Sequence, residues 1–177
     1  MIELQLSYFA KARVWLSELP PIDIQSTEIF KRVLPSQPGH VKDICLAGIE
    51  LYVPIGAKIN YALLAGKFMP DATEHLSIEM SVTVAGGDLL TWALASNVDK
   101  VRAGLAEEYA AAVLNGMSGA AGMLGSGVLT LGPAAHGVIS SSPNMFTAIA
   151  KALLSILKAN PRNLSDETTS QILKGFI

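Results

Sequence analysis

The residues best suited to chemistry are a histidine and a run of serines near a predicted helix start. His136 is followed by Ser140, Ser141 and Ser142, and Pro143 comes next. Serine before proline is a typical helix beginning, with serine as the N-cap and proline at the first helical position. Free backbone N–H groups at such a point bind anions, and a nearby imidazole can act as a general base. His136 and the three serines are therefore the predicted binding residues, with His136 as the candidate catalytic group.

The same histidine also has a purely structural interpretation. A lone histidine becomes catalytic only with a geometric partner, and the spacing of the chain ties no acid or nucleophile to His136. His40, His75 and His136 lie far apart and have no cysteine companions, so no metal site and no cofactor is predicted. A functional loop histidine and a structural histidine beside an ordinary helix cap both stay open.

A second candidate is the glycine-rich stretch NGMSGAAGMLGSGV at residues 115–128. A phosphate-binding loop needs Lys followed by Ser or Thr after its last glycine, and no basic residue follows before Lys151. A dinucleotide-binding fingerprint opens a helix, whereas these glycines follow one. The favoured interpretation is a helix that ends near Asn115 and Gly116, with glycine in the left-handed conformation, and then a loop into the next strand.

Composition and charge limit the class of protein. The 177 residues are 50% hydrophobic and 16% charged, with a formal net charge of −2. Such a chain is ordered and can bury a sizeable core. Because it has no basic run, RNA is a disfavoured partner. Surplus apolar surface on a small fold is commonly covered by a second copy, so we expect a homo-oligomer, and other protein partners stay open.

Residues 109–150 carry no formal charge, which raises the question of a membrane span. A spanning helix needs roughly 20 consecutive apolar residues. Glycines, Pro133, Pro143 and a serine cluster interrupt this stretch, so no span is predicted. The single cysteine, Cys45, has no disulfide partner in the chain, and the first residues include charges where a signal peptide would be apolar. We therefore expect a cytoplasmic protein.

Hydrophobic periodicity predicts several strands. Residues 1–73 alternate short apolar runs with turn signals, and two such runs around PIGAK predict a hairpin, although INYALLAG could also form a helical turn. In HLSIEMSVTV, apolar residues alternate with polar ones from Leu76 to Val84, which is the period of a half-buried strand. The stretch LLTWALAS is predicted as a second strand that pairs with it. The chain is thus divided into a strand-rich segment over 1–73, which could join the same sheet, and an α+β domain over 74–177.

Two main helices are predicted after these strands. The first follows apolar residues at helical spacing, either as one helix capped at Asn97 or Asp99 or as a helix that begins near Leu105 because Gly104 interrupts it. Its apolar positions are Val101, Leu105, Tyr109, Val113 and Met117. The second begins at Ser142 and buries a stripe made by Phe146, Ile149, Leu153, Ile156 and Leu157. Tyr109 and Trp92 are expected in the core, and Ser165 or Thr168 is expected to cap a short terminal helix.

The element order from residue 74 resembles domain IV of translation elongation factor G, which has a ribosomal protein S5 domain 2-like fold. GLAEEYAAAVLNGM, GMLGSG and HGVISSSPNMFTAIA are similar to that family's helix, glycine turn and last helix start. The resemblance covers about residues 74–160 and implies a sheet with two helices on one face. It would place His136 in a tip loop that approaches transfer RNA. The family's acidic residue before the serine pair is Ile139 here, and no GTPase domain is recognised in these residues.

Two classes of function follow. The preferred hypothesis is a non-catalytic binding or assembly module on the translation-factor-like fold, because no acid–base constellation accompanies His136. The alternative is a small-molecule enzyme or ligand-binding protein that uses the loop around His136. The string GPAAHGV supports this alternative, since it is similar to part of formaldehyde-activating enzyme in the same fold group. Fold alone does not decide between the two, so whether the chain catalyses a reaction stays open.

Overall fold

One mixed sheet organises the whole molecule. The computed structural model describes residues 1–23, 28–39, 41–83 and 87–177. Within them, eight strands form a sheet in the order β1-β2-β4-β5-β8-β6-β3, with β7 pairing with β8 off this path, and the described pairs are antiparallel except β6 with β8. The strands are β1 (Ile2–Gln5), β2 (Lys11–Leu16), β3 (Glu28–Pro35), β4 (Cys45–Ile55), β5 (Lys58–Pro70), β6 (His75–Val82), β7 (Val101–Ala103) and β8 (Gly127–Gly137). Strands from both 1–73 and 74–177 therefore share one sheet.

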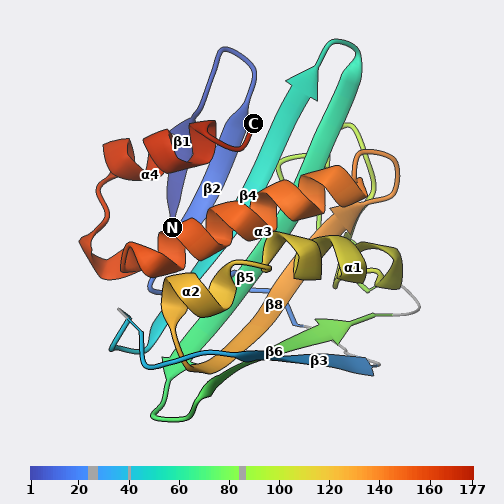
Figure 1. The fold of residues 1–177 in the computed structure, drawn as a ribbon. Coiled ribbons are helices and arrows are strands. Elements are labelled where there is room, and N and C mark those ends of the chain that lie inside the picture. Colours follow the sequence, from blue (N-terminus) through green and yellow to red (C-terminus); the bar gives the residue numbers. More distant parts are fainter. Residues whose placement is uncertain (24–27, 40, 84–86) are drawn as a thin grey trace.

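Helices cover one face of this sheet, as the sequence predicts. The helices are α1 (Glu107–Gly116), α2 (Ala120–Leu124), α3 (Pro143–Lys158), the 3-10 helix η1 (Pro161–Asn163) and α4 (Asp166–Lys174). Figure 1 shows α1, α2 and α3 together in front of the sheet, with α3 crossing β4 and β5. The mixed α+β class is thus confirmed. Among the described helices, none combines the length and the apolar character needed to cross a membrane.

The core between helices and sheet follows from two periodicities. Alternate residues of β4 from Cys45 to Val53 point toward the helices and are buried, as their period of two requires. On α3, the predicted stripe from Phe146 to Leu157 is buried, while Lys151 and Lys158 are exposed. Ser142 caps α3 by accepting a hydrogen bond from the backbone of Met145, as predicted. The most apolar helix therefore covers the centre of the sheet.

The opposite face is partly covered by residues 88–100, a segment of turns. Beneath it lie Trp15, Tyr61 and Leu63, which form a second, smaller apolar cluster with Ala93 and Ala95 from the segment. We call residues 88–100 the covering segment. The covering segment buries residues on the second face of the sheet, although it contains neither a helix nor a long strand.

The prediction that LLTWALAS forms a strand beside β6 is wrong. Both neighbours of β6 are other strands, β3 and β8, so no edge is free for residues 89–96 to pair with it. This stretch instead turns back over the sheet, and the backbone N–H of Leu90 bonds Val101 O at 2.9 Å. Trp92, expected in the core, is 36% exposed at the surface of this segment. The predicted strand over 76–84 is confirmed for the part that lies in β6, while Val84 lies outside the described residues, as does His40.

The long form of the first predicted helix is also wrong, and the shorter alternative is confirmed. Val101 belongs to β7, and Gly104 has a φ of 95°, which is not helical. The helix α1 then begins at Glu107 after Ala106, so neither Asn97 nor Asp99 caps it. A glycine with positive φ turns the chain from β7 into α1, which is why helical spacing across residues 101–117 did not produce one helix.

The glycine stretch ends α1 at Gly116, but without a left-handed glycine there. The next residue, Met117, has a φ of −87°, and the glycines of this stretch with positive φ are Gly125, with a φ of 100° after α2, and Gly127, with a φ of 146°. The expected loop thus contains a short helix. A Cβ at Gly116 would lie 2.7 Å from the carbonyl oxygen of Thr147, so this glycine permits close packing of α1 on α3. Packing, and not chain reversal, explains Gly116.

Candidate functional site

His136 lies within a strand, which corrects the expected tip loop. It faces Arg102 across the β7–β8 pair, because β8 continues to Gly137. The side chain is 8% exposed, and its Nδ1 lies 2.9 Å from the carbonyl oxygen of Gly104. The ring also lies near Tyr109, with centroids 5.9 Å apart. His136 thus contacts a backbone oxygen and an aromatic ring, while its predicted chemical role stays a prediction.

The three serines surround the turn between β8 and α3 and bond to the protein itself. Ser140 Oγ donates to Asp99 Oδ2 at 2.6 Å. Ser141 Oγ donates to the carbonyl oxygen of Tyr61 at 2.7 Å and accepts from the backbone N–H of Gly137 at 2.9 Å. Ser142 caps α3. These hydroxyls therefore fix the turn, and their hydrogen bonds are directed inward.

Asp99 of the covering segment, which the sequence suggested only as a helix cap, also bonds to this turn. Its Oδ2 also accepts hydrogen bonds from the backbone N–H groups of Ile139 and Ser140, at 3.0 and 2.8 Å. Partial burial works against the charged form, but hydrogen bonds from Ser140, Ile139 and Lys100 outweigh it and lower the pKa of Asp99. A carboxylate from the covering segment thus caps backbone N–H groups forty residues along the chain.

Next to these inward bonds, the turn presents apolar side chains to solvent. Val138 and Ile139 are 58% and 81% exposed, and Val98 from the covering segment is exposed as well. The backbone N–H of Val138 bonds Lys100 O at 3.1 Å, which joins the two segments. This end of the molecule is therefore a rigid turn with an aliphatic surface.

A second polar cluster lies beneath the covering segment. Glu50 of β4 is fully buried, and its Oε1 accepts hydrogen bonds from Tyr61 Oη at 2.9 Å and from the backbone N–H of Leu94 at 2.8 Å. Arg13 Nη1 lies 3.6 Å from Glu50 Oε2 and donates to the carbonyl oxygen of Trp92 at 2.7 Å. Glu50 Oε2 itself has no hydrogen-bond partner among the described residues. Two side chains of the sheet thus hold the backbone of the covering segment.

Burial sets the ionisation of this cluster. Loss of solvation raises the pKa of Glu50, although the hydrogen bonds from Leu94 and Tyr61 and the charge of Arg13 act in the opposite direction. Burial beside Glu50 also raises the pKa of Tyr61 well above its ordinary value. A cavity of about 590 Å³ opens above the cluster. It is lined by Glu3, Lys11, Arg13, Tyr52, Thr91, Trp92, Ala93, Leu94, Ser96, Asn97 and Val98.

The outer edge of the sheet at β3 is a third feature. β3 pairs with β6 on one side, and no strand of the described residues pairs with its other side. Ile29 and Val33, which lie on the face away from the helices, are 68% and 55% exposed. Lys31 Nζ bonds Glu79 Oε1 on β6 at 3.0 Å. An open strand edge with exposed aliphatic residues is a surface on which another strand can pair.

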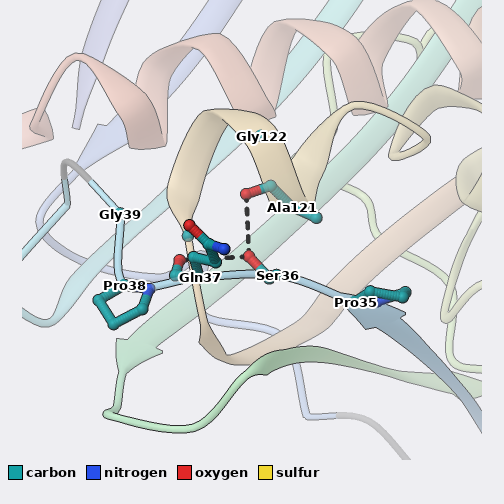
Figure 2. A pocket seen from close by; sticks show the side chains of 8 residues that line it. Pro35, Ser36, Gln37, Pro38, Gly39, Ala121 and Gly122 are labelled. Carbon is teal, nitrogen blue, oxygen red and sulfur yellow. Dashed lines mark hydrogen bonds between the residues drawn. The ribbon is translucent and has the colours of Figure 1, made fainter.

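A pocket of about 400 Å³ lies where the chain leaves β3. Figure 2 shows the residues that line it. Ser36 Oγ donates to the carbonyl oxygen of Ala121 in α2 at 3.1 Å, and the backbone N–H of Ser126 donates to Gln37 O at 2.9 Å. Its lining consists of Pro35, Ser36, Gln37, Pro38, Gly39, Ala121, Gly122 and Gly125. The described lining residues carry no ionisable side chain, and their polar groups are backbone atoms and the side chains of Ser36 and Gln37.

Comparisons of this chain with family models, curated proteins and solved structures find no match. In the part of the chain that the structure describes, no group of three or more His, Cys, Asp or Glu side chains could hold a metal ion. The residues that are close together in space are instead those of the two polar clusters, centred on Asp99 and on Glu50. Both clusters bond backbone groups of the protein, so the geometry favours a structural role for them.

Proposed function

We propose that this chain is a non-catalytic binding or assembly module that associates with a second copy of itself. One observation carries the proposal. Among the described residues, no strand pairs with the outer edge of β3 over Glu28–Pro35, and exposed Ile29 and Val33 lie along this edge. Half of the backbone N–H and C=O groups of an edge strand point outward, and a strand from another molecule can satisfy them. A homo-oligomer built in this way covers apolar surface that a single chain leaves in water.

The proposal extends to the fold family of residues 74–160. We propose that residues 74–160 form a ribosomal protein S5 domain 2-like unit similar to domain IV of elongation factor G. Support comes from the parallel pairing of β6 with β8, between which β7, α1 and α2 lie in the chain, and from α1 and α3 on one face. The net charge of −2 argues against RNA as the partner. The cytoplasm is the compartment that a single, unpaired and buried Cys45 favours.

The alternative of an enzyme or ligand-binding protein that uses the segment around His136 has less support. A general base needs a ring that a substrate can reach, and His136 is 8% exposed. Its Nδ1 lies within hydrogen-bonding distance of a backbone oxygen, and the neighbouring Ser140 and Ser141 bond to Asp99 and to the backbone. Assembly explains the exposed apolar residues on β3, whereas catalysis at His136 explains none of them.

Light scattering at micromolar concentration tests the proposal. The wild-type chain should show twice its mass of 18.7 kDa. Ile29→Lys combined with Val33→Lys should return the mass to that of one chain, because the two new charges lie on the open edge. Tyr8→Lys is the matched control, since Tyr8 is 88% exposed but lies in the turn between β1 and β2, at the other end of the sheet. A wild-type chain that stays monomeric contradicts the proposal.

A further inference from the structure

We infer that β3 pairs antiparallel with β3 of a second copy about a two-fold axis at Phe30, so that Glu28 of each copy faces Arg32 of the other. This inference rests on the proposed self-association and gives it a register. It follows from three properties of the strand: an edge that is open, charges that are unpaired, and a sequence order that is self-complementary in one arrangement.

Charged residues on an edge strand usually prevent pairing with other molecules, so the charges of β3 need an explanation. Lys31 is bound by Glu79 across the β3–β6 pair, which draws its side chain toward β6. Glu28 and Arg32 are both exposed, and in the described part of the chain neither forms an ion pair. Their positions differ by four, an even number, so they lie on the same face of the sheet. Two opposite charges are thus available on one face of the open edge.

Antiparallel pairing about Phe30 places these charges opposite each other. Residues that face each other across such an axis have numbers that add up to the same total, so Glu28 meets Arg32 and Phe30 meets its own copy. Ile29 then faces Lys31, and residues 28–32 are the part of the paired segment in which both facing residues are described. Opposite charges directly across two strands stabilise the pair, and two symmetric contacts of this kind form. Phe30, which packs partly on the core, supplies an aromatic contact at the axis.

The other registers lack this complementarity. An axis at Lys31 places Lys31 opposite itself, and an axis at Arg32 places Arg32 opposite itself, and like charges directly across two strands are destabilising. An axis at Val33 places Arg32 opposite Leu34 and brings Pro35, which has no N–H group, into the hydrogen-bond ladder. Of these axes, only the one at Phe30 places opposite charges directly across the two strands.

Charge reversal tests this register. Glu28→Arg and Arg32→Glu should each weaken the dimer at least about tenfold in dissociation constant, because each places two like-charged pairs across the axis. The double variant Glu28→Arg/Arg32→Glu should return the constant to within about threefold of wild type, because the opposite charges are restored. Glu167→Arg, which makes the same charge change on exposed α4, is the matched control and should leave the constant unchanged.

Mixing the two single variants gives a second test that does not depend on how stable either variant is alone. One variant carries two positive charges at positions 28 and 32 and the other carries two negative ones, so an equal mixture should recover the dimer mass by sedimentation. If the single reversals leave the dissociation constant of the dimer unchanged, or if the mixture stays monomeric, the register is wrong but self-association can still hold. A wild-type chain that is monomeric overturns both.

Discussion

The two faces of the sheet are covered by different kinds of structure, and different interactions stabilise them. On one face, α1 and α3 bury a continuous apolar layer that includes Phe146 and alternate residues of β4. On the other face, the covering segment is held by Glu50, Tyr61 and Arg13 above a small apolar cluster. The helix face depends mainly on apolar area removed from water, whereas the second face depends on a few directed hydrogen bonds.

This difference has a consequence for mutation. Removing an apolar group from the helix face leaves a cavity, and its cost grows with the volume lost. Removing an acceptor from the second face leaves buried donors without a partner, and the stability lost is the desolvation free energy of those donors. Substitutions on the two faces should therefore lower the stability for different reasons, and the expected losses decrease from the helix face to the polar contacts of the second face.

Phe146→Ala should lower the free energy of unfolding by about 3–5 kcal/mol, because Phe146 is fully buried and stacks on Tyr109 with ring centroids 4.6 Å apart. Urea unfolding followed by circular dichroism measures the change. Trp92→Ala is the matched control on the second face, since Trp92 is also aromatic but 36% exposed. Equal losses for the two variants would contradict the distinction between the faces.

Glu50→Ala should cost about 2–4 kcal/mol, because Tyr61 Oη and the backbone N–H of Leu94 lose their acceptor while buried. Glu50→Gln is the control, because an amide oxygen can accept the same two bonds without a charge. Hydrogen exchange of the Leu94 amide should rise in the alanine variant more than in the glutamine variant. If both variants behave alike, the carboxyl group does not hold the covering segment.

Asp99→Ala should cost about 1–2 kcal/mol, because the N–H groups of Ile139 and Ser140 and the Ser140 hydroxyl lose an acceptor at a site that water can partly replace. The amides of Ile139 and Ser140 should exchange faster. Asp88→Ala, an exposed carboxylate in the same covering segment, should leave them unchanged. Unchanged protection in the Asp99 variant would show that the turn is held by other bonds.

The smallest expected effect is a dependence of stability on pH. Since burial raises the pKa of Glu50 in the folded state, the folded state holds this proton more tightly than the unfolded state does. The free energy of unfolding should therefore fall as the pH rises from the ordinary carboxyl pKa through the raised one. Glu50→Gln should lose that part of the slope. Unfolding measured at several pH values in this window checks it, and an identical slope in wild type and variant would exclude Glu50 as the cause.

Much of the helix face could be predicted from the sequence, because its signals are local. The stripe from Phe146 to Leu157 and the Ser142 cap of α3 need only helical spacing and a serine before a proline. The alternation in β6 likewise needs only neighbouring residues. Each of these patterns is complete within a few turns or one strand, so distant parts of the chain did not change it.

The candidate sites could be predicted only in part. The serines of the β8–α3 turn were identified as polar residues near a helix start, but their partner Asp99 was considered only as a cap for a nearby helix. His136 was assigned to a loop because a strand of eleven residues, ending at Gly137, was not predicted. The edge strand β3 was not recognised as a strand at all. Its place at the edge follows from its pairing with β6, and the paired residues Lys31 and Glu79 are forty-eight positions apart in the sequence.

By itself, then, the sequence determined the mixed α+β class, the apolar helix α3 with its cap, and the alternating strand β6. Only the tertiary structure decided that residues 88–100 fold over the sheet, that Glu50 is buried, and that β3 lies at an open edge. The physical reason is that periodicity reports which face of an element is apolar, but not what covers the other face. Glu50 occupies an outward position of β4 that spacing alone assigns to solvent, and a segment forty-four residues away supplies the N–H that buries it.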